Sequence, residues 1–265
     1  MFADIHNHLV PGVDDGAKTL DDSFAMLDQA VAAGVKLICA TPHLHGDPDE
    51  VETHQHHKRS YEALKSEIAK RGYDVEVYLG CEVYCTPDIN ELAALKEFTL
   101  REQQKYMLIE LPPTDAPHYF PELCFQLKME GITPILAHPE RNLALLRRPE
   151  ILVKYIRSGI LTQVTTDALT GGFGEQIMKF AERIVKSGAC TVLSSDAHNT
   201  GRRSFASWPD AFKKVNEIAG TGLAKKMSFD NAKTILEGNI LSLPDFSDES
   251  ADILKTEKKK RFFFF

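Results

Sequence analysis

Short apolar runs alternate with segments of helical periodicity along most of this 265-residue chain, and the alternation limits the folds that it can adopt. In one such segment Phe24, Leu27 and Val31 recur at the spacing of a helix face. A cap-like pattern, Thr19-x-x-Asp22, precedes them. Strands that alternate with helices form a parallel sheet covered by those helices. Seven runs are predicted to be strands: Ala3–His8, Lys36–Thr41, Val75–Glu82, Tyr106–Leu111, Thr133–His138, Ile160–Thr165 and Thr191–Ser195.

The seven strand–helix units follow one another without a linker, so the pattern favours one closed barrel over two domains. We therefore expect an α/β fold resembling a TIM barrel, with seven strands in a single domain. A doubly wound open sheet is the alternative, although no GxGxxG follows the first strand. We place the barrel at residues 1–244 and a flexible basic and aromatic tail at 245–265.

The charge of the chain is unevenly distributed. The net charge is −7, and residues 255–265 carry +4, which leaves −11 for the rest. An acidic body argues against a broad nucleic-acid-binding face. No apolar run approaches the roughly 20 residues of a membrane helix, and the N-terminus lacks a secretory pattern, so we expect a cytoplasmic protein. The five cysteines include no CxxC pair and are predicted to be free thiols.

Imidazole and carboxylate side chains gather at the predicted strand ends. Active sites of barrels form at the C-terminal ends of the strands, and five of the seven predicted ends carry such groups. Because residues i and i+2 share one side of a strand, His6 is expected beside His8. A lone histidine here is most often just a hydrogen-bonded polar residue, but five clusters are not explained that way. The candidates are His6, His8, Asp15, His43, Glu82, His138, Asp196 and His198.

Eight candidate ligands exceed the three or four that one zinc ion needs. Carboxylates packed together repel one another, and divalent cations remove that cost by binding carboxylate and neutral imidazole. We therefore expect two or three divalent metal ions. A nitrogen and oxygen ligand set without sulfur suits manganese, iron or zinc. Neighbouring metal ions of this kind activate water for attack on a phosphoryl centre.

Several motifs together resemble the polymerase-and-histidinol-phosphatase (PHP) superfamily: DIHNH, TPH, GCEVY, AHPER and SSDAHN. HLVPGVDDGA, LIELP, LAHPERN and TGGFGEQ are more narrowly similar to its bacterial tyrosine-phosphatase branch, which is linked to capsule and exopolysaccharide synthesis. The motifs occur in order over residues 1 to about 240. The resemblance implies a distorted seven-stranded barrel and a trinuclear, commonly manganese-dependent centre. It also implies hydrolysis of phosphotyrosine on the C-terminal tail of a cognate membrane tyrosine autokinase.

The resemblance also implies roles for individual residues. It places the family's metal ligands on the same eight candidates, with Asp15 rather than Asp14 taken from the acid pair. Asp14 is expected to cap its loop or to support a ligand. Arg141 and Arg202 resemble the phosphate-binding arginines of the family, and Arg203 is the alternative to Arg202. Arginine suits this role because its planar fork can contact two phosphate oxygens.

Two further catalytic roles are expected, and one mechanism is excluded. His198, beside the metal ions, is expected to act as a general acid, with bound water as the alternative. Glu140 is interpreted as positioning Arg141. Cysteine-dependent tyrosine phosphatases need an arginine six residues after the nucleophilic cysteine, and none of the five cysteines here has one.

Rival functions start from the same residues. A histidinol-phosphate or other small-molecule phosphatase would use the same metal ions. A non-catalytic regulator that binds the kinase would be expected to have lost ligands, and all eight are present. DNA processing, as in polymerase-attached PHP domains, conflicts with the acidic body.

Three segments are left with two interpretations each. The loop LPPTDAPHYFP, residues 111–121, either frames a bound peptide or is a stiff connection. His54, His56 and His57, like His45, are interpreted as solvated polar residues rather than ligands. The tail KKKRFFFF, residues 258–265, is interpreted as a disordered end, with weak membrane-surface contact as the alternative.

Overall fold

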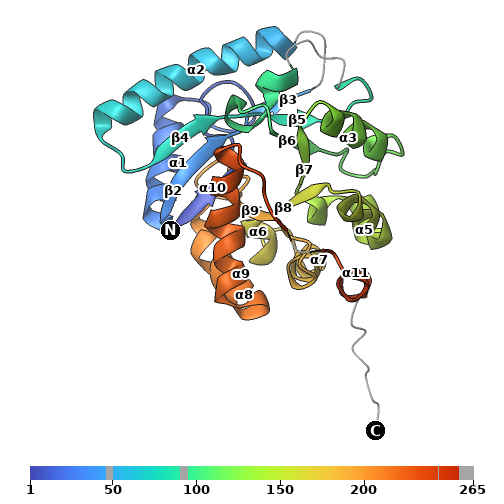
Figure 1. The fold of residues 1–265 in the computed structure, drawn as a ribbon. Coiled ribbons are helices and arrows are strands. Elements are labelled where there is room, and N and C mark those ends of the chain that lie inside the picture. The colour runs from blue at the N-terminus through green and yellow to red at the C-terminus, as the bar shows by residue number, and fades with distance from the viewer. Residues whose placement is uncertain (46–49, 90–94, 244, 257–265) are drawn as a thin grey trace.

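The computed structural model describes residues 1–45, 50–89, 95–243 and 245–256, and its strands are all parallel with helices around them (Figure 1). The predicted α/β class is therefore confirmed. The strands described are β1 (Phe2–Asp4), β2 (Val35–Ala40), β3 (His43–Leu44), β4 (Glu76–Leu79), β5 (Glu82–Tyr84), β6 (Tyr106–Glu110), β7 (Thr133–Ala137), β8 (Leu161–Thr165) and β9 (Val192–Ser194). The α-helices described are α1 (Leu20–Ala33), α2 (Glu50–Arg71), α3 (Phe120–Met129), α4 (Leu143–Arg147), α5 (Pro149–Arg157), α6 (Thr166–Leu169), α7 (Glu175–Lys186), α8 (Trp208–Ala219), α9 (Thr221–Lys225), α10 (Asn231–Leu236) and α11 (Asp248–Lys255).

The strands form two sheets, in the order β1-β2-β4 and β3-β5-β6-β7-β8-β9. The described residues thus contain nine strands where the sequence predicts seven, because one short strand was not predicted and one predicted strand is divided. The predicted strand 36–41 corresponds to β2, and the unpredicted β3 follows after Pro42, which has no N–H to donate to a neighbouring strand. Residues 75–82 divide into β4 and β5 at Gly80, where an added Cβ would lie 3.0 Å from the Leu100 Cα.

The first and last strands approach each other beyond their ends. Asn7 and Ala197 form an isolated parallel bridge. The Asp196 N–H donates to the His6 carbonyl at 2.7 Å, and the His8 N–H donates to the Ala197 carbonyl at 2.8 Å. These bonds hold the segments after β1 and β9 side by side. A fully closed seven-stranded barrel remains a prediction.

The helices begin and end where local signals place them. The predicted cap at Thr19-x-x-Asp22 is a reciprocal capping box at the start of α1, and Gly34 ends that helix with φ +93°. The helix α7 buries an apolar stripe of Phe180, Ala181, Ile184 and Val185. Within the described residues, no helix is both long and apolar enough to cross a membrane.

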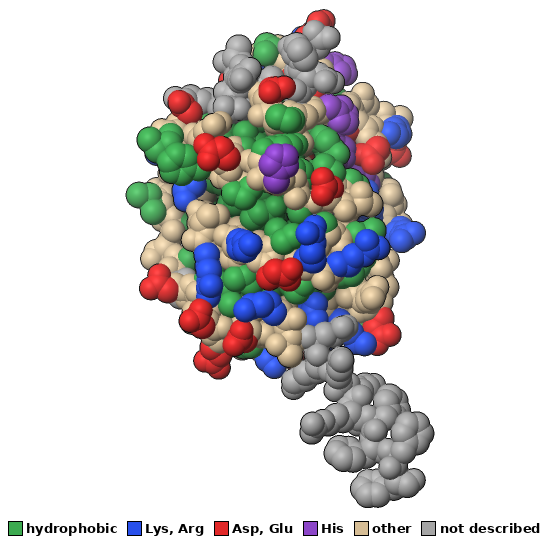
Figure 2. Space-filling model, turned by 90° about the vertical axis from the view of Figure 1, so that its right-hand side faces the viewer, with side chains coloured by type: hydrophobic (Ala, Val, Ile, Leu, Met, Phe, Trp, Pro, Cys, Tyr) green, Lys and Arg blue, Asp and Glu red, His purple; other side chains and the backbone are tan. Residues whose placement is uncertain are grey.

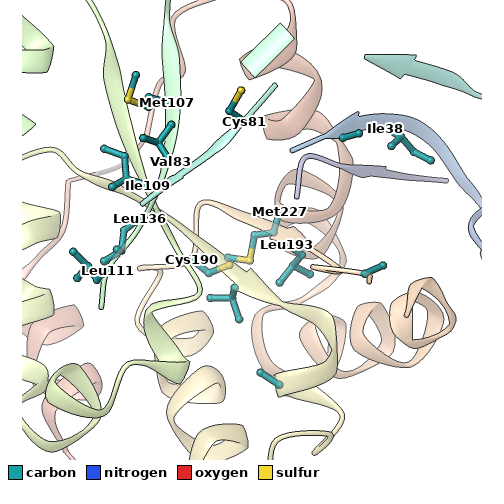
Figure 3. Close-up of a cluster of buried hydrophobic side chains, with 14 of the residues drawn as sticks. Ile38, Cys81, Val83, Met107, Ile109, Leu111, Leu136, Cys190, Leu193 and Met227 are labelled. Atoms are coloured by element: carbon teal, nitrogen blue, oxygen red, sulfur yellow. The ribbon is translucent and has the colours of Figure 1, made fainter. Parts of the chain in front are cut away.

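The cysteines lie in the apolar interior. All five are free and buried, as predicted, and Figure 3 shows Cys81 and Cys190 among aliphatic side chains such as Val83 and Leu193. Burial raises the pKa of the Cys39 and Cys85 thiols to about 12. These thiols stay protonated at neutral pH, so they are unsuited to nucleophilic attack.

The segment predicted to be a flexible tail contains an ordered part. Residues 248–255 form α11, which packs against α5 and α7. Its Ala251 and Leu254 are buried, and the Ser247 side chain caps its first turn. The helix forms because this short stretch carries a cap and one apolar face. Residues 257–265, which include the basic and aromatic run, lie outside the described residues.

One face of the molecule carries charges of both signs. Figure 2 shows basic side chains across the middle of this face, with acidic side chains among them and around them. A face of this kind presents a mixed electrostatic potential rather than a field of a single sign.

Candidate metal centre

The predicted ligands come together where β1, β7 and β9 end and where β3 and β5 begin. His6 and His8 follow β1, His43 begins β3, and Glu82 begins β5 directly after the break in its predicted strand. His138 follows β7, Asp196 and His198 follow β9, and Asp15 lies in the loop before α1. Parallel strands end on a common edge, so residues up to 190 positions apart in the chain become neighbours.

The most deeply buried group contains His6, His8, Glu82 and Asp196, none of which is exposed. The His6 Nε2 lies 3.0 Å from Glu82 Oε2 and 3.2 Å from Asp196 Oδ1. The His8 Nε2 lies 3.4 Å and 3.3 Å from the same two oxygens. Two imidazole nitrogens and two carboxylate oxygens therefore face a common point.

A second group adjoins the first through His8 and adds Asp15, His43 and His198. The Asp15 Oδ1 lies 3.1 Å from His198 Nε2 and 3.5 Å from His43 Nε2. The Asp15 side chain is 61% exposed, so this group opens to solvent while the first does not.

A third group includes Glu110, which was not among the sequence candidates. Its carboxylate lies 3.9 Å from His43 Nδ1 and 3.6 Å from His138 Nε2. Glu82 belongs to this group too, with Oε2 3.1 Å from His43 Nδ1 and Oε1 3.0 Å from His138 Nε2. Burial, followed by the charge of Glu82, raises the pKa of Glu110 to about 7. The sequence signal for Glu110 is its position as an acidic residue at the C-terminal end of the apolar strand β6.

The donor atoms of the first group fit a cation. His6 Nε2, His8 Nε2, Glu82 Oε2 and Asp196 Oδ1 are buried, yet none of them has a hydrogen-bond partner. Buried polar atoms without partners are costly, and a divalent ion would satisfy all four at once. Burial also lowers the pKa of His138 to about 4, so that its imidazole is neutral and can act as a ligand at pH 7.

Neighbouring side chains orient the two central imidazoles. The His6 Nδ1 donates to Gln163 Oε1 at 2.8 Å, and the His8 Nδ1 lies 2.6 Å from Asp14 Oδ2. Each contact holds Nδ1 and leaves Nε2 facing the shared point. Asp14 also accepts from the Gly16 N–H at 2.9 Å and from the His43 N–H at 3.2 Å. It therefore caps the loop and supports His8, which was its expected role, whereas Gln163 was not identified from the sequence.

Two guanidinium groups border the first group on the side of Asp196. Arg141 NH1 pairs with Asp196 Oδ2, and Arg203 NH2 donates to the same oxygen at 2.7 Å. Arg202, the neighbouring residue, is exposed. The structure thus favours Arg203 over Arg202, because a one-residue shift in an irregular loop changes which side chain turns inward.

The chain matches the family model described as capsular polysaccharide synthesis, CpsB/CapC, over residues 2–237. The chain belongs to the CpsB/CapC family. CapC of Staphylococcus aureus is 35% identical over 213 residues, covering 77% of this chain and 80% of that protein. The tyrosine-protein phosphatase YwqE of Bacillus subtilis is 32% identical over 238 residues, covering 90% of this chain and 92% of that protein.

Solved structures agree with this family membership. One chain from the crystal structures of YwqE from Bacillus subtilis and CpsB from Streptococcus pneumoniae has a TM-score of 0.82 and 29% identity. The match covers 91% of this chain and 97% of that chain, and those two proteins are described as unique metal-dependent tyrosine phosphatases. The lactonase Lmo2620 from Listeria monocytogenes, at 12% identity and a TM-score of 0.54, covers 88% of this chain and 94% of that chain, and shares the fold only.

Glu140 of this CpsB/CapC chain lies on the same turn as Arg141, which it was expected to position. Its buried carboxylate accepts from the Thr165 N–H at 2.8 Å and from the Thr165 hydroxyl. Glu140 thereby fastens the turn after β7, which carries Arg141, to the end of β8.

The proline-rich loop is tied to the same HPERN motif. The Asn142 amide donates to the carbonyls of Pro112 and Asp115 at 2.8 Å each. The same side chain accepts from the Leu145 N–H at 2.9 Å and caps α4. These bonds fit the interpretation of the loop as a stiff connection. Asn142, which directly follows Arg141 in the chain, holds the loop close to that arginine.

The histidines of α2 were only partly predicted. His56 is exposed as expected, but His54 and His57 are buried, because the helix turns that face toward the loop after β1 and the strands. His54 lies 3.3 Å from Glu102, and together with Glu97 the three can form a further ligand group. Lys58 already places its ammonium 2.8 Å from Glu102, so a cation is present in that group without a metal ion.

Proposed function

We propose that this CpsB/CapC member is a metal-dependent protein-tyrosine phosphatase that acts on the phosphotyrosine tail of a cognate membrane tyrosine kinase in capsule or exopolysaccharide synthesis. The observation that carries the proposal is the overlap of three ligand groups, two of which share Glu82, with two guanidinium groups at their edge. With divalent ions bound, this arrangement would offer concentrated positive charge to a phosphoryl group. The similarity to YwqE and CpsB supports phosphotyrosine as the substrate.

The ligand groups suit two or three divalent ions. Mn²⁺ is the ion that we propose, with iron or zinc as alternatives. His6, His8, Glu82 and Asp196 would hold one ion, and Asp15, His43 and His198 would hold the next with His8 nearby. Glu110 and His138 would complete the third group together with Glu82. When bound, these ions would supply Lewis-acid charge and an activated water. Closure of the two sheets into the distorted seven-stranded barrel is part of the same proposal.

The arginines bind the phosphoryl oxygens in this proposal. Each guanidinium has five N–H donors in a planar fork. Contacts to Asp196 use part of each fork, and the remaining N–H groups of Arg141 and Arg203 are available to an anion. Asp196 therefore both faces the metal group through Oδ1 and holds the phosphate-binding side chains through Oδ2.

We assign His198 to metal binding rather than to acid catalysis. Its Nδ1 donates to the Asp196 carbonyl oxygen at 2.9 Å, and its Nε2 faces Asp15. The Nε2 atom is buried without a hydrogen-bond partner and would be taken up by a bound ion, which leaves neither ring nitrogen to protonate the leaving group. Free tyrosine has a pKa of about 10, so tyrosinate is a better leaving group than an alkoxide. A proton from solvent is then sufficient for the leaving oxygen.

Chelation is expected to lower hydrolysis of a phosphotyrosine peptide about 1,000-fold, because the buried donor atoms lose the charge that they are arranged to hold. Elemental analysis before and after chelation, with activity measured on return of Mn²⁺, Fe²⁺ or Zn²⁺, checks this result. Histidinol phosphate at matched concentration is the comparison substrate. Full activity without metal contradicts the proposal, and faster turnover of histidinol phosphate favours the small-molecule alternative.

Arg203→Ala is expected to weaken inhibition by inorganic phosphate about 30-fold, because a charged hydrogen bond to the anion is lost. Arg202→Ala is the matched control, since the two residues are adjacent and Arg202 is exposed. Its inhibition constant is expected to stay within about two-fold of the wild type. If the larger effect follows Arg202 instead, the assignment of the two arginines is wrong.

The partner and location stand as proposals beside the activity. An acidic body and an open, solvent-facing second ligand group suit a peptide substrate presented from outside the fold. A cytoplasmic location would place the site beside the intracellular tail of a membrane kinase. Contact of residues 258–265 with a membrane surface remains a prediction from their sequence.

A further inference from the structure

The motif TGGFGEQ, residues 170–176, contributes no ligand to the metal centre. It follows the short helix α6, which comes directly after β8. Residues 170–174 connect α6 to α7 in a tight loop. The Gly172 N–H donates to the Asp167 carbonyl at 2.8 Å, and the Gly174 N–H donates to the Gly171 carbonyl at 2.9 Å. Gly171 and Gly174 have φ values of +89° and +92°, which other residues rarely adopt. The loop is therefore held in one shape, and Phe173 is its single large side chain.

Phe173 lies against one of the phosphate-binding arginines. Its ring is half-buried, and the ring centroid is 4.8 Å from the central guanidinium carbon of Arg141. Arg141 at the same time pairs with Asp196. The aromatic ring therefore stands at the edge of the metal centre, next to the guanidinium that would hold a phosphoryl group.

A phosphate monoester has one substituent, which must point away from the groups that hold its oxygens. Arg141 and Arg203 approach Asp196 from the side that borders the ligand groups. The ester group of a phosphate held at the free edge of Arg141 then lies beside the ring of Phe173. Two aromatic rings with centroids about 4.5–7 Å apart attract each other by more than their buried area explains, whereas a small alkyl group gains little.

We propose that Phe173 is a specificity-determining residue that makes this site prefer aryl over alkyl phosphate esters. The inference rests on the proposed phosphatase function and names the feature that would select phosphotyrosine. Phe173 contacts the organic group of the ligand, while Arg141 and Arg203 contact its phosphoryl oxygens. Loss of the ring should therefore reduce binding of aryl ligands and leave the binding of small alkyl ligands unchanged.

Isothermal titration of the Mn²⁺-loaded protein with phenylphosphonate and methylphosphonate separates these contributions without any turnover. We expect the wild type to bind phenylphosphonate about ten-fold more tightly than methylphosphonate. Phe173→Leu keeps an apolar side chain but removes the ring, and it should reduce that ratio to about two-fold. Phe173→Tyr keeps the ring and should preserve the ratio. Phe125→Leu, at a 58% exposed position on α3, is the matched control and should leave the ratio unchanged.

Two results overturn the inference. In the first, Phe173→Leu keeps the wild-type ratio; if both ligands also bind more weakly, Phe173 only holds Arg141 in place. In the second, the wild type has no preference between the ligands. Failure of the proposed function gives a different result: the wild type binds phenylphosphonate preferentially but does not hydrolyse a phosphotyrosine peptide with any of the three metals.

Discussion

Replacement of Glu82 by glutamine is expected to lower phosphotyrosine-peptide hydrolysis by about 1,000-fold. Glu82 belongs to two of the three ligand groups. One of its oxygens lies 3.0 Å from His6 Nε2 and 3.1 Å from His43 Nδ1, and the other lies 3.0 Å from His138 Nε2. Glutamine has nearly the same shape but no negative charge, so it cannot offset the charge of neighbouring cations.

Metal content separates this effect from a general loss of structure. Elemental analysis of Glu82→Gln should show fewer bound ions per chain, while far-ultraviolet circular dichroism of the variant should match the wild type. Glu52→Gln, at an exposed position on α2, is the matched control and should retain full activity and metal content. A Glu82→Gln protein that keeps more than about a tenth of the wild-type activity would show that Glu82 is not the shared ligand.

Replacement of Asp4 by asparagine is expected to lower the free energy of unfolding by about 3 kcal/mol. Asp4 is fully buried at the end of β1. Its Oδ2 accepts from the Ser195 N–H and the Trp208 indole N–H at 2.8 Å each, and its Oδ1 accepts from the Asn7 amide at 3.0 Å. An asparagine must place an NH₂ group against one set of these donors, which leaves buried donors without acceptors.

The single tryptophan gives a direct measurement of this loss. Trp208 is fully buried and bonds to Asp4, so its fluorescence during urea unfolding reports on the region that the substitution changes. Asp21→Asn, at an exposed position in the first turn of α1, should change the free energy of unfolding by no more than about 0.5 kcal/mol. Equal midpoints and slopes for Asp4→Asn and the wild type would refute the role given to Asp4.

The ligand cluster was predictable because its residues are polar where the sequence should be apolar. His6, His8 and Asp196 follow apolar strands, and parallel strands must place their ends together. That argument needs only the period of the apolar pattern and the rule that barrel sites lie at strand ends. The structure brings all eight candidates to one place, while their roles as ligands remain predictions.

Residues that act through neighbours were harder to identify. Gln163 and Asp4 lie inside a strand or at its end, with no pattern around them that differs from an ordinary polar residue. Their importance comes from hydrogen bonds to residues more than 150 positions away in the sequence. Periodicity describes one element at a time, so it does not contain information about such partners.

Loops and helix faces show the same limit. Arg202 and Arg203 are adjacent and chemically identical, so only the path of the loop decides which guanidinium reaches Asp196. On α2 the sequence predicts a polar helix, but its tertiary position buries His54 and His57. A polar residue is buried or exposed according to what packs over it, and that depends on the whole fold.

The sequence by itself determined the α/β class, the strand ends that carry the chemistry and the type of ligand that gathers there. These follow from local regularities: the alternation of strand and helix, and the departure of His6, His8 and their partners from an apolar pattern. Only the tertiary structure decided that Glu110 joins the ligand groups, that Arg203 faces Asp196, and that Phe173 lies against Arg141. Those contacts depend on distances between separate elements, which arise only when the elements pack.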